Sequence, residues 1–118
     1  MIAEILSVGT ELLMGQIANT DAQYISRRLS ELGVTLYRHT TVGDNPARVK
    51  EALNEALARA DVVITTGGLG PTEDDLTKEM VAEYFGLEMR LDEASLRAIE
   101  GFMRRVGHPM GENNRKQA

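Results

Sequence analysis

A glycine-rich turn followed by two adjacent carboxylates lies near the middle of the chain, in the stretch Ile64–Lys78 with sequence ITTGGLGPTEDDLTK. A short apolar run leads into the turn, and Asp74 and Asp75 open a pattern typical of a helix. Where a strand passes through glycines into a helix, unpaired backbone N–H groups point outward and attract anions. We therefore predict that this turn binds a phosphate group.

Two carboxylates beside a phosphate repel it unless a cation lies between them. The turn lacks the GxxxxGK[ST] pattern that supplies a lysine, and Lys78 falls a turn into the expected helix. A divalent cation with oxygen ligands and retained water fits such carboxylates. We predict that Asp74, Asp75 and Glu11 hold Mg²⁺, Mn²⁺ or Co²⁺, and that a metal-bound water attacks phosphorus, which makes the same three residues the catalytic candidates.

Other residues near the turn are candidates for contact with the ligand through backbone N–H or hydroxyl groups. Glycine allows the backbone to approach a ligand closely, and threonine hydroxyls can orient it. The predicted ligand-binding residues are Gly67, Gly68, Leu69, Gly70, Thr10, Thr72 and Thr77.

Each candidate also has a structural interpretation. The glycines suit a tight turn, and Glu11 suits a solvated loop. Either aspartate suits a helix N-cap, which contributes ~0.5–2 kcal/mol, but one helix does not need two caps. Arg115 and Lys116 are predicted to be a solvated part of a tail without regular structure.

Composition limits the classes of protein. The 118 residues suffice for one domain; 42% are hydrophobic and 26% charged, as in globular proteins. No apolar run approaches the ~18 residues of a membrane span, and the N-terminus lacks a signal-peptide pattern. The chain has no cysteine, which favours the cytoplasm, and its net charge of -5 without a long basic run argues against nucleic-acid binding.

Strand and helix patterns alternate along the chain and must position these residues. Strands are predicted at Ile2–Val8, 34–42 and 62–66. Helices are predicted from Thr20, with Thr20 as N-cap and Gln23 as its capping-box partner, from Asn45 as N-cap, from about Asp74, and from Asp92 as N-cap. Segment 9–19 is expected to be a loop, and 87–91 a short extended piece. This alternation predicts an α/β fold with a parallel sheet between helices.

Ligands of open parallel sheets bind beyond the carboxyl ends of the strands. Three loops leave such ends here, at Gly9-Thr10-Glu11, at Gly43-Asp44-Asn45 and at Gly67–Asp75. Each combines glycine with a carboxylate. We therefore expect the three loops to lie side by side and to form one site.

The stretch from Gly67 to Thr77 closely resembles the signature loop of the molybdopterin-binding domain superfamily, and its GGLGPTxDDxT form resembles the CinA (competence-damage-inducible) family. Supporting stretches are Val8–Thr20, Val42–Asn45 and the tail from Met110 to Ala118. The resemblance spans the whole chain and implies a three-layer αβα fold with a mostly parallel sheet, similar to MogA.

The resemblance implies two functions for the site. One is a metal-dependent pyrophosphatase acting on ADP-ribose or a related nucleoside-diphosphate sugar. The alternative is a module that binds molybdopterin or another pterin without turnover. It also implies a homo-oligomer, for which the apolar stretch Leu12, Leu13, Met14 and Ile17 is a candidate contact, and a C-terminal nicotinamide-nucleotide deamidase domain in the full-length protein.

The chain departs from the family pattern in two places. Asp21 stands where the family usually has asparagine, which either disfavours a direct phosphate or sugar contact or adds a metal ligand. The family domain continues with GTAPG-like and LPGxPxE-like segments that this sequence lacks. We therefore expect a single domain, 1–118, that is incomplete at its C-terminal end.

Overall fold

Three parallel strands form the centre of the computed structural model, which describes residues 1–118. They are β1 (Ile2–Val8), β2 (Thr35–Val42) and β3 (Val62–Thr66), in the spatial order β2-β1-β3. β1 pairs with β2 up to Val8↔Val42 and with β3 up to Ser7↔Thr66. The three carboxyl ends therefore lie at one edge of the sheet, as the alternating pattern predicts.

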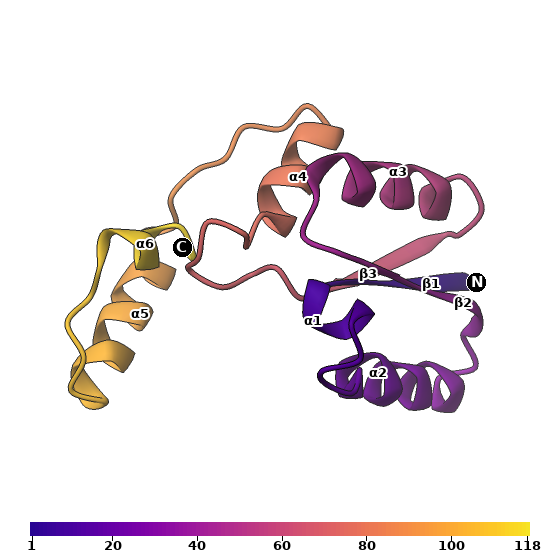
Figure 1. Cartoon of the computed structure of the whole chain (residues 1–118), viewed down its shortest axis with the longest axis horizontal. Helices are drawn as coiled ribbons and strands as arrows, with labels where there is room; N and C mark the ends of the chain where they lie inside the picture. The colour runs from indigo at the N-terminus through magenta and orange to yellow at the C-terminus, as the bar shows by residue number, and fades with distance from the viewer.

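The helices cover both faces of this sheet. In Figure 1, α2 lies on one face and α3 and α4 lie on the other, which confirms the three-layer αβα prediction. No helix is long and apolar enough to cross a membrane. The helices are α1 (Thr10–Leu13), α2 (Thr20–Glu31), α3 (Pro46–Leu57), α4 (Thr77–Tyr84), α5 (Glu93–Arg105) and α6 (Glu112–Arg115).

The core is aliphatic and is built on β1, whose residues from Ala3 to Val8 are all buried. Leu6 packs against Ala52 and Leu53 of α3. Nearer the carboxyl end, Val8 packs with residues of α3 and α4. Because β1 is buried on both faces, its position in the sheet is fixed by packing. The loop that follows β1 belongs to the candidate site and is therefore held in a defined place.

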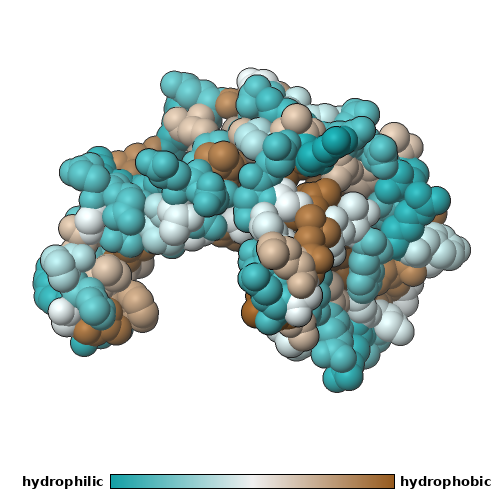
Figure 2. All heavy atoms as spheres, in the orientation of Figure 1, coloured by the Kyte–Doolittle hydropathy of each residue, from teal (hydrophilic) through white to brown (hydrophobic).

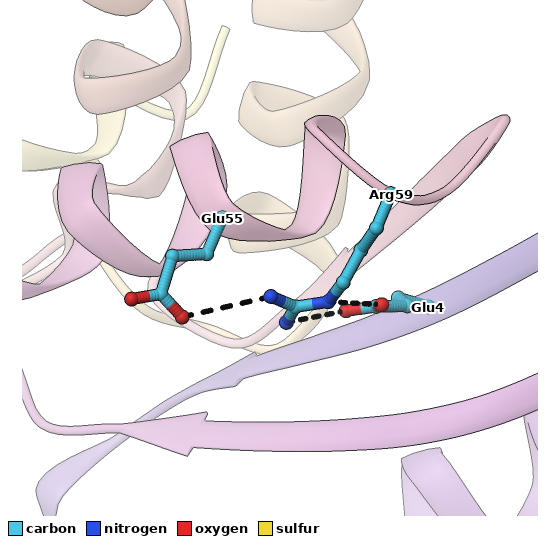
Figure 3. Close-up of polar contacts among 3 residues, drawn as sticks. All are labelled: Glu4, Glu55 and Arg59. Atoms are coloured by element: carbon cyan, nitrogen blue, oxygen red, sulfur yellow. Dashed lines mark hydrogen bonds and ion pairs between the residues drawn. The ribbon is translucent and has the colours of Figure 1, made fainter.

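One buried carboxylate lies in β1, at the end of the sheet away from the site. Glu4 is 3% exposed and accepts two hydrogen bonds from Arg59, from Nε at 2.6 Å and from Nη2 at 3.0 Å (Figure 3). Glu55 lies on the other side of the same guanidinium, at 3.7 Å. The hydrogen bond to Glu4 is the main cause that raises the pKa of Arg59. A bidentate pair of this kind is what a buried carboxylate requires.

Helix capping confirms some predictions and corrects others. Asn45 and Asp92 are N-caps, as predicted, and accept from the backbone N–H groups of Arg48 and Ser95. The N-cap of α2 is Asn19 instead of Thr20, because the Asn19 side chain reaches the N–H of Ala22.

Two segments predicted to be loops contain short helices, and one predicted helix starts late. α1 lies within segment 9–19, and α6 lies in the tail. Helix α4 begins at Thr77 instead of about Asp74, because Asp75 bonds to Thr72 and closes a separate turn. The expected extended piece at 87–91 has no strand partner.

Helices α5 and α6 project from the sandwich as a lobe, next to a hollow on the surface (Figure 2). The radius of gyration is 15.7 Å, against about 13.5 Å for a compact domain of this length. Within α5 only Leu96 is buried, and Val106, directly after the helix, is exposed. The base of the lobe is closed by a hydrogen bond within the lobe, from the N–H of Asp92 to the carbonyl of Ala118 at 3.1 Å.

Candidate functional site

The turn after β3 requires glycine at two consecutive positions. Gly67 and Gly68 have φ values of 80° and 65°, a region that side chains disfavour. A Cβ at Gly67 would lie 2.1 Å from the carbonyl oxygen of Val8, and one at Gly68 would lie 2.1 Å from Oγ1 of Thr77. The backbone of this turn therefore runs directly against β1 and the start of α4.

Three successive N–H groups in this turn, those of Gly67, Gly68 and Leu69, donate no hydrogen bond within the protein. The next one, Gly70, differs because its N–H interacts with the Asp75 carboxylate. Of the four predicted ligand-binding residues in this turn, three therefore keep a free N–H group and Gly70 does not. Consecutive free amides in a turn form a site that suits an anion.

Thr77 holds the turn in this shape. Its side chain is buried, and its hydroxyl donates to the carbonyl of Gly67 at 2.8 Å. Its backbone N–H donates to the carbonyl of Gly68 at 3.1 Å. Both contacts turn glycine carbonyls toward α4, so Thr77 positions the loop and its hydroxyl is already engaged.

Asp75 and Thr72 bond to each other. One oxygen of Asp75, Oδ2, accepts from the backbone N–H of Thr72 at 2.9 Å and from its hydroxyl at 2.6 Å. The hydroxyl bond is the main cause that lowers the pKa of Asp75, and the Gly70 and Thr72 amides and the charge of Lys116 act in the same direction. These contacts give the second half of the loop its fixed conformation.

The first and second loops are joined by a reciprocal pair of hydrogen bonds. The N–H of Thr10 donates to Oδ2 of Asp44, and the N–H of Asp44 donates to Oγ1 of Thr10, both at 3.1 Å. Glu11, one residue on, folds its carboxylate over Gly9. The expectation that the loops meet at the sheet edge is confirmed for this pair.

A cavity of about 110 Å³ lies between the first loop and the glycine turn. Its apolar lining comes from β1, α1 and the α1–α2 connection, and its polar lining includes two acidic residues, Glu11 and Asp21, together with Gly67. The lining residues are Val8, Glu11, Leu12, Ile17, Ala18, Asn19, Thr20, Asp21, Thr66 and Gly67. A second hollow of about 300 Å³ shares Asp21, Thr66 and Gly67 with it and extends past Tyr24, Ile25 and Leu69.

Three polar side chains, from β1, the start of α2 and β3, are joined by hydrogen bonds in a row next to the cavity. The buried Ser7 hydroxyl accepts from Nδ2 of Asn19 at 2.8 Å and from Oγ1 of Thr66 at 3.1 Å. Asn19 also caps α2. Sequence reasoning assigned no role to Ser7 or Asn19, although Asn19 belongs to the family-like stretch, because the row joins three elements far apart in sequence.

The three carboxylates of the predicted metal site are not brought together. Glu11 lines the main cavity, while Asp74 lines a separate small cavity beside Asp44. Asp75 is engaged with Thr72. No group of three or more histidine or acidic side chains is placed to hold a metal ion. In this structure the three residues predicted as metal ligands therefore do not form a site that fits a divalent metal ion.

A cation does reach the signature loop from the tail. The ammonium group of Lys116 donates to the carbonyl of Thr72, and Nζ of Lys78 donates to the carbonyl of Lys116 at 2.7 Å. The prediction of a solvated Lys116 is wrong, since the residue is half-buried. No local pattern could indicate a contact across 44 residues.

A family model described as "Probable molybdopterin binding domain" matches residues 4–117. The chain belongs to this family. The resemblance that the signature loop carries is therefore confirmed.

Within the family the chain is of the CinA type. It is 58% identical over 118 residues to a putative competence-damage inducible protein of Clostridium novyi and 60% identical to a CinA-like protein of Dictyoglomus turgidum. All of this chain is covered in both comparisons, but only 28% and 29% of the relatives. The chain thus spans less than a third of the length of the curated relatives it matches.

Solved structures share the fold. The CinA protein of Thermoplasma acidophilum superposes with a TM-score of 0.83 at 34% identity, over 98% of this chain and 67% of that one. The molybdopterin biosynthesis enzyme MoaB of Thermus thermophilus superposes with a TM-score of 0.67 at 24% identity, over 98% and 70%. The molybdopterin-binding fold is therefore shared by CinA-type and MoaB-type chains.

Proposed function

We propose that this CinA-type domain binds a phosphorylated pterin of the molybdopterin class at the carboxyl edge of its sheet. The observation that carries the proposal is a cavity that connects the turn with free amides to two acidic residues. The N–H groups of Gly67, Gly68 and Leu69 have no partner in the protein. Gly67 lines the cavity together with Glu11 and Asp21, and Leu69 lines the adjoining hollow.

The two sides of the cavity suit the two ends of such a ligand. A phosphate ester accepts hydrogen bonds from consecutive backbone amides. A pterin ring presents an amino group and a ring N–H side by side, and this pair of donors matches a carboxylate such as Asp21. The apolar side chains of Leu12 and Ile17 on the cavity wall suit a flat ring.

The hydrolase interpretation, which assigns ADP-ribose as substrate, stays a second candidate. The observation in its favour is that Asp44 and Asp74 line the same small cavity beside the loop. A pair of carboxylates is a common element of phosphoryl chemistry, but no third ligand lies with them. Release of AMP from ADP-ribose is the result that would support this candidate.

The two candidates are separated by titrating the ¹⁵N-labelled chain with molybdopterin, with the same pterin lacking its phosphate, and with ADP-ribose. We expect molybdopterin to shift the amide resonances of Gly67, Gly68 and Leu69, and the dephosphorylated pterin to bind more weakly without shifting them. If molybdopterin leaves these three resonances unchanged, the proposal is wrong. If ADP-ribose shifts them and is converted to AMP, the hydrolase candidate is favoured instead.

A further inference from the structure

One lysine contacts the signature loop at the start of its acidic half, and a second lysine contacts the backbone of the first. Residues 73–75 are Glu, Asp and Asp, so the loop carries three carboxylates in a row. Lys116 donates from its ammonium group to the carbonyl of Thr72, at the start of this run. Nζ of Lys78, in α4, donates to the backbone carbonyl of Lys116 at 2.7 Å. Both lysines are half-buried.

Thr72 lies between the positive and the negative group. Its carbonyl accepts from Lys116, while its N–H and hydroxyl both donate to Asp75. Thr72 thus contacts both the carboxylate and the ammonium group. The ammonium group has three donors and makes one hydrogen bond within the protein, so two donors remain for a ligand.

The tail that carries Lys116 is ordered by its own contacts. The side chain of Asn114 accepts from the N–H of Gly111 at 3.0 Å and donates to Gln117 at 3.2 Å. The carbonyl of Ala118 accepts from Asp92 at the start of α5. In Figure 1 the end of the chain lies against the loop between β3 and α4. Lys116 is therefore held in place at the loop.

We propose that Lys116 is the cation that binds the phosphate of the ligand at the signature loop, so that binding needs no divalent metal. This inference rests on the proposed function. It assigns to a side chain of this protein the role that sequence reasoning gave to a metal ion held by Asp74, Asp75 and Glu11. Lys116 contacts the loop at Thr72, three residues after the free amide of Leu69. A charged donor at this loop strengthens phosphate binding because charge-assisted hydrogen bonds are stronger than neutral ones.

The test uses pyrophosphate as the probe and the 118-residue chain in EDTA, followed by the amide resonances of Gly67, Gly68 and Leu69. Lys116→Gln removes the charge but keeps an N–H donor for the Thr72 carbonyl. Arg115→Gln removes the same charge from an exposed neighbour and is the matched control. We expect K116Q to weaken pyrophosphate binding by roughly ten-fold or more, R115Q to change it little, and Lys116→Arg to restore most of it.

Three outcomes overturn the inference. One is equal pyrophosphate affinity of K116Q and the unsubstituted chain. Another is binding by the unsubstituted chain that requires added Mg²⁺. In both cases the proposed function stands, because the amides still respond to phosphate. The third is the absence of any response to pyrophosphate and to molybdopterin, with and without Mg²⁺, which overturns the proposed function as well. Because a loosened tail also weakens binding, the amide resonances of Gly111 and Asp92, which donate to the tail, should be unchanged in free K116Q. Restored binding in Lys116→Arg then attributes the loss to charge.

Discussion

Asp75 illustrates how a residue of the signature loop acts through its neighbours. It accepts from the N–H and the hydroxyl of Thr72 with one oxygen, and the Gly70 amide adds to this contact. The carboxylate thereby closes the turn that precedes α4. Its negative charge is balanced in part by Lys116. Asp74, the adjacent residue, is exposed and makes no such contact.

The Asp75 contacts predict a pH-dependent stability. Because the pKa of Asp75 is lower in the folded chain than its ordinary value of 3.8, the contribution is fully present above that value and is lost as the pH falls through the folded pKa. We expect Asp75→Asn to lower the free energy of unfolding by roughly 1–2 kcal/mol at pH 6 and by much less near pH 2.5. Urea unfolding at both pH values measures the difference.

Asp74→Asn is the matched control for this prediction, since it removes the same charge from the next position. It should change the free energy of unfolding little at pH 6. Equal effects of the two substitutions at both pH values would show that the hydrogen bonds of Asp75 contribute nothing to stability.

At the scale of elements, the site depends on how the strands and helices end. β1 and β3 deliver the first loop and the glycine turn to one edge, and the start of α2 closes the cavity between them. Asn19 connects these elements, because it caps α2 and bonds to Ser7 of β1 at once. Asn45 caps α3 and makes no second contact of this kind.

This difference between two caps is measurable. We expect Asn45→Ala to lower the free energy of unfolding by about 1 kcal/mol, as typical N-cap removal does. Asn19→Ala should lower it by about 2 kcal/mol, because the buried Ser7 hydroxyl also loses a partner. Thermal or chemical denaturation of both variants gives the comparison. If Asn19→Ala were no more destabilising than Asn45→Ala, the row of Ser7, Asn19 and Thr66 would have no energetic role.

At the scale of the whole molecule, the sandwich carries two features that lie outside its core. One is the lobe of α5 and α6, which is joined to the rest of the chain by the contacts of Lys116 with Thr72 and Lys78. The other is the apolar stretch after β1. Leu12 and Ile17 of this stretch line the cavity, while Leu13 and Met14 are 56% and 67% exposed. Exposed apolar side chains in a row suit a contact with another subunit.

The homo-oligomer predicted from sequence is testable at this stretch. We expect light scattering to give a multiple of the 13.0 kDa chain mass for the unsubstituted protein and a lower mass for Leu13→Asp, because a buried charge disfavours the contact. Leu32→Asp, at a leucine that is 70% exposed at the end of α2, should leave the mass unchanged. If the unsubstituted chain is already monomeric, or if Leu13→Asp leaves the mass unchanged, the prediction of a subunit contact at this stretch is wrong.

The sequence by itself determined the local features of this protein. The apolar runs of β1 and β3 match the predicted strands, Asn45 and Asp92 cap the helices that they precede, and the glycines of the turn adopt the conformation that only glycine favours. These features depend on residues within a few positions of each other. Local propensity and the alternation of elements therefore sufficed for the α/β fold and for the family resemblance.

Only the tertiary structure decided which groups of the site meet. Asp44 bonds to Thr10 across 34 residues, and Lys116 reaches Thr72 across 44. Asp75, predicted to hold a metal, bonds to the nearer donors of its own turn. A charged side chain takes the partners that packing brings within about 3 Å, and sequence spacing does not reveal that distance. This is why the signature loop could be recognised from its residues, while the cation beside it could not.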